Sequence, residues 1–201
     1  MTRILLARHG ETDWNRQGRW QGHTDRPLTA TGRRQAEALA ARLAGERLDA
    51  LYASDLARAR DTAAAVERTV GIEAVLDPDL REVDVGDVAG LDRAEAREQY
   101  PDWFPRWWEG TDEAYPGGEP IAQLFHRAVG AFRRIEAAHP GQTVAVISHS
   151  GIIRAVVLWV LGLEPSGRRH IAPGPNGGLT VVERRGDRTV LVAFNESGHL
   201  V

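Results

Sequence analysis

Cysteine and lysine are both absent from this chain of 201 residues. Without cysteine, the chain has no disulfide bond, no thiolate nucleophile and no cysteine-ligated zinc site. Without lysine, it lacks the residue with which a P-loop contacts nucleotide phosphates and the side-chain amine on which a Schiff base forms. The 25 residues counted as lysine or arginine are therefore all arginine, which stays charged and binds phosphate or carboxylate through paired hydrogen bonds.

A strong charge imbalance and long hydrophobic runs are also missing. The formal net charge is −3, so the composition indicates no binding to nucleic acid or to a membrane surface. The longest apolar stretch, residues 151–163, is interrupted by Arg154 and is too short to span a bilayer. The N-terminal residues show no signal-peptide pattern. We therefore expect a cytoplasmic protein with one domain over residues 1–201; its oligomeric state is not readable, and a homodimer stays open.

Hydrophobic periodicity predicts strands that alternate with helices. Helices are expected from Thr29, as N-cap, to Gly45, from Ser54, as N-cap, to about residue 70, and over 93–99, 120–135 and 151–163. Strands are expected at residues 3–7, 48–54, 72–77 and 142–148, and a hairpin at 178–194 turns at Gly186-Asp187. Outside its one short helix, the region 80–118 is expected to be irregular. This pattern predicts an α/β three-layer sandwich, in which helices flank a mostly parallel sheet with the hairpin at its edge.

Polar side chains follow the predicted strands at the points where they end. Arg8 and His9 follow the first strand, and Arg58 lies one turn into the helix after the second strand. Glu82, preceded by Arg81, follows the third strand across a turn, and His149 follows the central strand at a helix N-terminus. Ligands of open α/β sheets bind at the carboxyl ends of the strands. We therefore expect these side chains to converge on one edge of the sheet.

This set of residue types suits phosphoryl transfer. A neutral imidazole is a competent nucleophile, arginines and a helix N-terminus stabilise the charge on the phosphoryl oxygens, and a carboxylic acid can protonate the leaving oxygen. The sequence shows no cluster of acidic residues and histidines at metal-ligand spacing, so we expect no metal and no cofactor. Each residue alone also has an ordinary structural interpretation, as a solvated or hydrogen-bonded surface side chain, and only their convergence favours catalysis.

Five segments resemble motifs of the histidine phosphatase, or phosphoglycerate mutase-like, superfamily. They are RHGETDWN, LTATGRRQA, YASDLARARDTA, LREVDVG and VISHSGIIR, in that order along nearly the whole chain. The resemblance, closest to the small phosphatase branch, implies that His9 is transiently phosphorylated. It implies that Glu82 is the proton donor and acceptor, and that Arg8, Arg58 and His149 bind the phosphoryl group and stabilise its transition state. It further implies substrate contacts from Asn15, Gln21 and Gly22, and a loop-building role for Glu11 and Thr12.

The family resemblance also predicts a small cap insertion at about residues 88–120. The segment between Glu82 and His149, which includes this cap, is shorter than in the family's cofactor-dependent mutases, which favours hydrolysis of a small phosphorylated metabolite. The alternative is a phosphoglycerate mutase, which transfers the phosphoryl group back to the substrate. A third possibility is a catalytically silent phosphate-binding regulatory protein. The cap carries Trp103, Phe104, Trp107 and Trp108, which either form a substrate wall or pack the cap against the body. Arg106 is expected to lie in solvent, and Glu119 to favour the start of the following helix.

Overall fold

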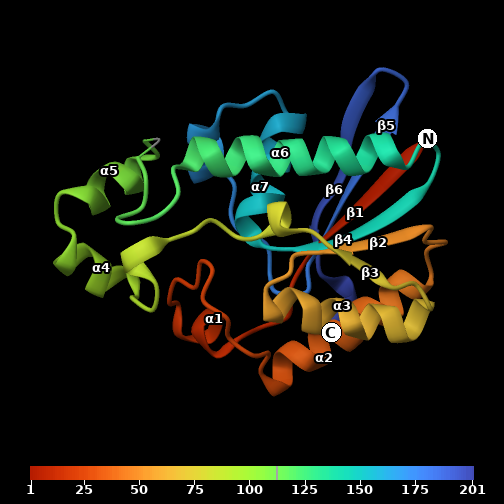
Figure 1. Cartoon of the computed structure of the whole chain (residues 1–201), viewed down its shortest axis with the longest axis horizontal. Coiled ribbons are helices and arrows are strands. Elements are labelled where there is room, and N and C mark those ends of the chain that lie inside the picture. The colour runs from red at the N-terminus through yellow and green to blue at the C-terminus, as the bar shows by residue number, and fades with distance from the viewer. Residues whose placement is uncertain (112) are drawn as a thin grey trace.

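A computed structural model describes residues 1–111 and 113–201, and over these ranges the chain forms a six-stranded sheet flanked by helices (Figure 1). The strand order is β3-β2-β4-β1-β5-β6. The bounds of the strands are β1 Thr2–Arg8, β2 Ala50–Ala53, β3 Ala74–Leu76, β4 Thr143–Ser148, β5 Leu179–Arg185 and β6 Arg188–Glu196. Strands β1 to β4 are mutually parallel, whereas β5 runs antiparallel to both β1 and β6. The prediction of a mostly parallel sheet with an edge hairpin is therefore confirmed.

Side chains of the central strands alternate between two helical layers, as the period of a strand requires. Ile4 and Leu6 of β1 belong to the core under α6 (Ile121–Ala138) and α7 (Ser150–Val160). Leu5 and Ala7 belong to the opposite core, under α2 (Ala30–Ala44) and α3 (Ala57–Val70). Both faces of the parallel strands are thus buried, which confirms the expected three layers and explains their continuous apolar sequence.

Most predicted helix ends agree with the structure, but one capping residue was wrong. Thr29 caps α2, its hydroxyl accepting a hydrogen bond from the backbone of Gly32, and α4 spans Arg93–Gln99 as predicted. Ser54, however, is not the N-cap of α3, because the chain extends to Leu56 before the helix begins. The buried Ser54 hydroxyl bonds to a histidine of the site described below.

The region predicted to be irregular contains a helix that the sequence did not indicate. Helix α5 spans Trp103–Glu109, with Pro105 in its first turn, where proline is tolerated. Short 3₁₀ helices also occur at Pro78–Leu80 (η1), Gly86–Val88 (η2), Pro165–His170 (η3) and Gly198–Leu200 (η4), and a short helix α1 at Asp13–Gln17. Periodicity missed α5 because aromatic residues occupy both its buried and its exposed faces: Trp103 is 7% exposed, whereas Trp108 is 56% exposed.

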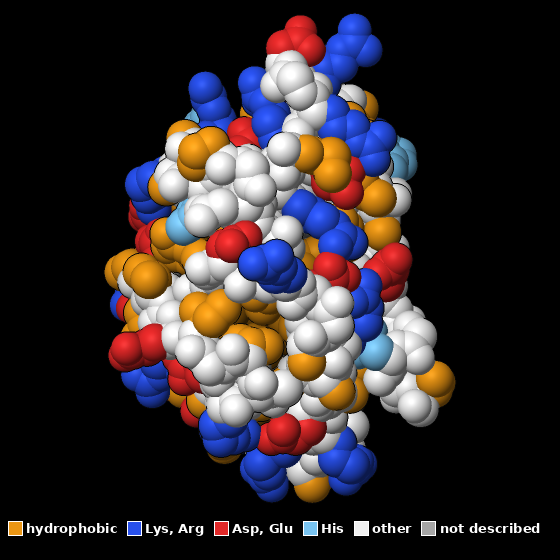
Figure 2. Space-filling model, turned by 90° about the vertical axis from the view of Figure 1, so that its right-hand side faces the viewer, with side chains coloured by type: hydrophobic (Ala, Val, Ile, Leu, Met, Phe, Trp, Pro, Cys, Tyr) orange, Lys and Arg blue, Asp and Glu red, His pale blue; other side chains and the backbone are white. Residues whose placement is uncertain are grey.

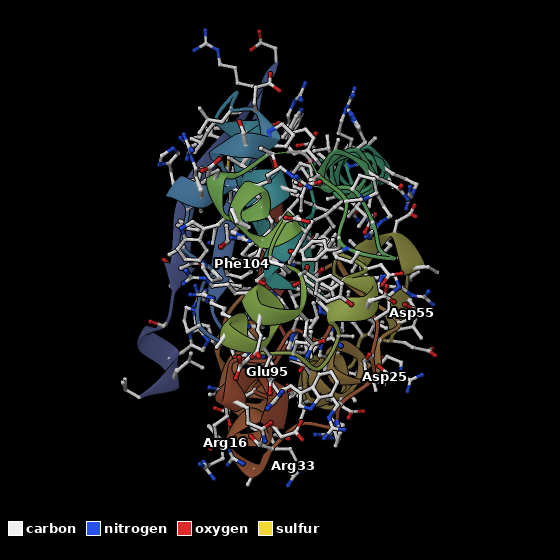
Figure 3. All side chains as sticks on the ribbon, turned by 90° about the vertical axis from the view of Figure 1, so that its left-hand side faces the viewer. Arg16, Asp25, Arg33, Asp55, Glu95 and Phe104 are labelled. Carbon is white, nitrogen blue, oxygen red and sulfur yellow. The ribbon has the colours of Figure 1, made fainter. Side chains whose placement is uncertain are left out.

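Helices α4 and α5 cover the carboxyl ends of the parallel strands (Figure 1). Figure 3 looks onto this side, with Glu95 of α4 and Phe104 of α5 labelled at the front. Glu95 forms an ion pair with Arg19 from the loop after α1, and Trp20 meets Trp107 edge to face, with ring centroids 5.3 Å apart. Trp107 thus packs the cap against the body, while Trp107 and Trp108 also line the cavity described below. The bounds of a cap insertion at about residues 88–120, within one domain of residues 1–201, stay a prediction.

The surface carries charges of both signs. On the face in Figure 2, arginines and acidic side chains are interspersed with small apolar areas. Arg106 lies at the surface as expected, where it pairs with Glu113. Throughout the described ranges, none of the helices combines the length and the apolar character that crossing a membrane requires.

Candidate active site

One cavity of about 730 Å³ opens at the carboxyl ends of β1 and β4, between the body and helices α4 and α5. Most of the residues predicted for the site line it: Arg8, His9, Asn15, Gln21, Gly22, Arg58 and Glu82. His149 lies behind this wall, fully buried, with its ring centroid 5.0 Å from that of His9. Arg81 is not part of the site, because its guanidinium is paired with Asp55, which is labelled in Figure 3.

His9 presents one nitrogen lone pair toward an arginine. Its Nδ1 lies 2.7 Å from the carbonyl oxygen of Gly10, which can only accept, so Nδ1 carries the proton. Nε2 is therefore unprotonated and accepts a hydrogen bond from Arg58 Nε across 3.2 Å. Burial, followed by the charges of Arg58 and Arg8, lowers the pKa of His9 well below its ordinary 6.5. The ring is thus neutral at neutral pH, with Nε2 as the nucleophilic atom.

Two buried arginines flank this ring. Arg58 donates to the carbonyl oxygens of Gly22 and Thr24, at 2.8 and 3.1 Å, and burial lowers its pKa to about 10. Arg8 donates to the carbonyl oxygen of Gly174 at 2.5 Å, while its buried Nε has no hydrogen-bond partner in the described part of the chain. Burial also lowers the pKa of Arg8. The pKa of Arg58 is still well above 7, so this guanidinium is protonated at neutral pH. The neutral nucleophile consequently lies beside fixed positive charge.

His149 is held by a hydroxyl group. Its Nε2 lies 2.8 Å from Ser54 Oγ, which itself accepts a hydrogen bond from the backbone of Leu56 at 3.3 Å. Its Nδ1 is buried and has no hydrogen-bond partner among residues 1–111 and 113–201. Burial and the nearby charge of Arg58 lower the pKa of His149 well below 6.5. The Ser54 hydroxyl can donate to Nε2, which leaves Nδ1 as an unused donor next to His9.

Glu82 is seated on the N-terminus of α7. Its two carboxylate oxygens accept from the Ser150 hydroxyl at 3.0 Å and from the Gly151 backbone N–H at 3.1 and 3.2 Å. A Cβ atom at residue 151 would lie only 2.1 Å from Glu82 Oε1, so glycine is required there. The carboxyl group is thereby fixed on the wall of the cavity that also holds His9.

A second group of side chains holds the main chain at Glu82, and the sequence did not point to it. Arg127 of α6 donates to the carbonyl oxygens of Asp79, Arg81 and Glu82 at 2.9, 2.8 and 3.3 Å. Its ion-pair partner is Glu119, which is buried rather than placed to stabilise the start of α6. An arginine on the helix after a proline-rich loop gives no sequence signal for this role.

Asn15, Gln21 and Gly22 lie in the loop that closes one side of the cavity. Asn15 forms a capping box with Thr12 at the start of α1, which agrees with the loop-building role expected for Thr12. The side-chain oxygen of Gln21 is buried and has no hydrogen-bond partner in the described ranges. Gly22 has a φ of 51° and contacts Val85 so closely that a side chain would not fit. The predicted substrate residues are therefore on the cavity wall, with Gln21 offering a free acceptor.

The far wall of the cavity contains Arg154 of α7 and Arg168 of η3, which the sequence did not single out. Trp107 and Trp108 of α5, for which the sequence left a substrate wall open, also line it. One signal did exist, because Arg154 is the only charged residue in an otherwise apolar helix. In the described ranges, no three histidine or acidic side chains are grouped so that they could hold a metal ion.

Comparison with known proteins gives the family. A profile of the histidine phosphatase superfamily, branch 1, matches residues 4–197. The chain belongs to this superfamily. It is 35% identical over its whole length to a metal-independent phosphoserine phosphatase of Arabidopsis thaliana, of which it covers 84%. It is 33% identical, again over its whole length, to phosphoserine phosphatase 1 of Hydrogenobacter thermophilus, of which it covers 95%.

The fold has a close counterpart among solved structures. YhfR of Bacillus stearothermophilus superimposes with a TM-score of 0.94 at 30% identity, each chain being covered over its full length. The predicted family and α/β fold are confirmed, and the relatives named phosphatases agree with the predicted phosphatase activity.

Proposed function

We propose that this histidine phosphatase hydrolyses small phosphomonoesters through a phosphohistidine on His9, with no metal ion. The observation that carries the proposal is the state of the His9 ring, which is neutral, with its Nε2 lone pair beside Arg58. When Arg58 Nε donates to a phosphoryl oxygen instead, the lone pair of this buried, uncharged imidazole is free to attack phosphorus, and the guanidinium attracts the phosphate to it. The Arabidopsis thaliana relative is named metal-independent, which supports chemistry without a metal ion.

In the first step, His9 Nε2 forms a bond to phosphorus as the bond between phosphorus and the ester oxygen breaks. The Glu82 carboxyl group enters this step protonated and donates its proton to the departing oxygen, which leaves as an alcohol. Its place on the wall that it shares with His9 supports this role, and the α7 N-terminus stabilises the carboxylate that the step leaves behind. The product is a phosphoramidate on His9 and an ionised Glu82.

Charge on the transferring phosphoryl group is stabilised by Arg8, Arg58 and His149. Arg8 Nε and His149 Nδ1 are buried donors without a protein partner in the described ranges, and a phosphoryl oxygen would satisfy each. Because these donors are fixed before substrate arrives, they need no reorganisation in the transition state. We assign the two arginines and His149 to the phosphoryl pocket on this basis.

In the second step, water attacks phosphorus in line with the His9 nitrogen. Glu82, now a carboxylate, accepts a proton from the water, the phosphorus–nitrogen bond breaks, and inorganic phosphate leaves. Glu82 is then protonated and His9 neutral, so both are ready for the next cycle. Asn15, Gln21 and Gly22 border the entrance, and we assign them to contacts with the leaving group or the outer phosphate oxygens.

O-phosphoserine is the first substrate to test, because two relatives that match the whole chain carry the name phosphoserine phosphatase. The experiment compares the native protein with His9→Ala in excess EDTA. The native protein should release phosphate with chelator present and acquire acid-labile label from ³²P-substrate, whereas His9→Ala should do neither. Loss of activity with EDTA, or labelling that survives in His9→Ala, would contradict the mechanism. Conversion of 3-phosphoglycerate to 2-phosphoglycerate without phosphate release would show a mutase instead.

Several predictions from composition accompany this proposal. They are a cytoplasmic location, no cofactor, a small phosphorylated metabolite as the partner, and no binding of nucleic acid or membrane; a homodimer stays open. The modest net charge of −3 supports the two negative expectations. Phosphate release that does not change on addition of DNA or anionic vesicles would agree with them.

A further inference from the structure

Arg154 is a cation without a counter-charge on the wall of the cavity. It lies on α7, and its Nε is buried with no hydrogen-bond partner in the part of the chain that the structure describes. Over the same ranges, Arg154 takes part in no hydrogen bond and no ion pair. Arg127, by contrast, is paired with Glu119, and Arg19, another lining residue, with Glu95. An unpaired charge next to a cavity costs stability unless a ligand neutralises it.

The position of Arg154 separates it from the donors assigned to the phosphoryl group. On α7 it lies three and four residues after Gly151 and Ser150, so it shares their face of the helix but lies one turn deeper. It lines the same cavity as Arg8, at the catalytic end, and as Tyr115, the buried tyrosine that contacts Trp103 and Trp107 of α5. Arg154 is therefore close to the phosphoryl pocket but is not one of the groups that bond to His9.

The cavity itself is larger than a phosphate ion needs. Its volume is about 730 Å³, which is in the range of pockets that enclose an entire organic ligand. The wall of this cavity includes apolar side chains, among them Leu158, one turn after Arg154 on the same helix, Phe125 on α6 and Trp107 on α5. Such a wall suits a short carbon chain, which would bring a second charged group to the guanidinium.

We propose that Arg154 binds a second anionic group of the substrate, so that this phosphatase selects phosphomonoesters that also carry a carboxylate or a second phosphate. The inference rests on the proposed function, because it takes the phosphoryl group to lie at His9. A guanidinium matches both anions through two parallel hydrogen bonds. Phosphomonoesters of the same size that lack a second anionic group would leave Arg154 unpaired in the complex, and the cavity would therefore disfavour them.

Matched pairs of substrates test this inference. O-phospho-L-serine and O-phosphoethanolamine differ only in the carboxylate, and 3-phosphoglycerate carries a carboxylate where glycerol 3-phosphate has a neutral hydroxymethyl group. Propane-1,3-diyl bisphosphate and propyl phosphate form the pair for a second phosphate. In at least one pair, the native protein should have the higher kcat/KM for the member with the second anion. The pair with the larger ratio of kcat/KM shows whether the second anion is a carboxylate or a phosphate. A preference for the member without it in all three pairs, or no preference in any, would overturn the inference.

The variants Arg154→Met and Arg154→Lys then locate the preference. With the doubly anionic substrate, Arg154→Met should lower kcat/KM by about 10- to 100-fold, mostly through KM, and Arg154→Lys should recover part of the loss. The ratio of kcat/KM between the two members of the pair should fall at least about tenfold. Arg106→Met is the matched control, since it removes an arginine that pairs with Glu113 on the surface and does not line the cavity.

The outcomes separate the two proposals. If Arg154→Met lowers turnover of both members of a pair by the same factor, Arg154 belongs to the phosphoryl pocket or to the fold, and the inference is wrong. If the native protein hydrolyses no pair and takes no label on His9, the proposed function fails before Arg154 is tested. A fall in the ratio with His9 labelling intact supports both.

Discussion

Arg58 donates a hydrogen bond from its Nε to Nε2 of His9, across 3.2 Å, and both side chains are buried. Only an unprotonated nitrogen can accept this hydrogen bond. The contact therefore fixes the tautomer of His9 that has its proton on Nδ1 and the nucleophilic lone pair on Nε2. The same guanidinium charge opposes protonation of the ring and lowers its pKa. One arginine thus orients the lone pair, keeps the ring neutral and supplies charge to the incoming phosphate.

Replacing Arg58 with lysine should expose this dependence. A lysine keeps the positive charge but has no planar fork, so it cannot bond to His9 and to the Gly22 carbonyl oxygen together. We expect Arg58→Lys to lower kcat by about 10²- to 10³-fold, the loss typical of one transition-state donor. Steady-state kinetics with p-nitrophenyl phosphate measures this. A loss below tenfold would mean that charge alone is sufficient; Arg60→Lys, an exposed residue of the same helix, is the control.

Stability should fall in mild acid because two histidines are buried in their neutral forms. Burial lowers the pKa of His9 and of His149 well below 6.5 in the folded protein, whereas both return to about 6.5 on unfolding. As the pH falls through 6.5, the unfolded chain therefore takes up protons that the folded chain does not. The free energy of unfolding should decrease by up to about 1.4 kcal/mol per pH unit for each histidine, and be fully recovered above that pH.

Urea denaturation at pH 7.5, 6.5 and 5.5, in buffers free of phosphate, measures this slope. His9→Gln should remove up to half of it, because one of the two titrating side chains is gone. His126→Gln, which changes a histidine on α6 outside the site, should leave the slope unaltered. Equal slopes in the native protein and in His9→Gln would show that His9 is not held neutral by the fold.

The sequence predicted the catalytic residues of the site better than the residues that hold them in position. Buried strands end where apolar runs end, so the positions of His9, His149 and Arg58 followed from strand topology together with the family resemblance. The supporting contacts involve residues far apart in the chain, such as Arg127 with Glu82, and no local pattern encodes such a pair. Helix α5 was missed for another reason, since its aromatic residues lie on both its buried and its exposed faces and leave no single apolar stripe.

Gly151 should be required for the hydrolysis of substrates whose leaving oxygen needs a proton. A methyl group at this position would lie about where Glu82 Oε1 now is, so Gly151→Ala should displace the carboxyl group from the α7 N-terminus. An alkyl phosphate needs a proton on its leaving oxygen, whereas p-nitrophenolate leaves readily without one. With O-phosphoserine we expect kcat of the variant to fall by a factor of about 10² or more. With p-nitrophenyl phosphate the factor by which kcat falls should be several times smaller. Equal losses would mean that Glu82 does not act as the acid.

Arg127 should affect the same step from a distance. Removing its guanidinium leaves Glu119 buried without its partner and releases three carbonyl oxygens of the chain that carries Glu82. Arg127→Met should therefore destabilise the protein by on the order of 3 kcal/mol. The turnover of alkyl phosphates should fall more than that of p-nitrophenyl phosphate, as for Gly151→Ala. Arg134→Met, an exposed arginine on the same helix, controls for loss of charge. Lower stability with an unchanged ratio of the two rates would limit Arg127 to a structural role.

Ser54 offers the most specific test of how His149 acts. Its hydroxyl group lies 2.8 Å from His149 Nε2, and by donating there it leaves the proton on Nδ1, the nitrogen that has no partner in the described ranges. Ser54→Ala removes that donor, so the His149 ring can adopt the other tautomer, with its Nδ1 lone pair facing the phosphoryl oxygens. We expect kcat to fall about 10- to 100-fold, with a smaller change in KM.

Binding of vanadate, which imitates the transferring phosphoryl group, should weaken in Ser54→Ala by a similar factor, because the donor to the transition state is misplaced. Ser54→Thr retains the hydroxyl group and should restore most of both losses, provided that the added methyl group is tolerated in this buried position. A melting temperature near that of the native protein in Ser54→Ala would exclude general unfolding as the cause. If Ser54→Ala binds vanadate as tightly as the native protein, the tautomer of His149 does not depend on Ser54, and the assignment of Nδ1 as the phosphoryl donor loses its support.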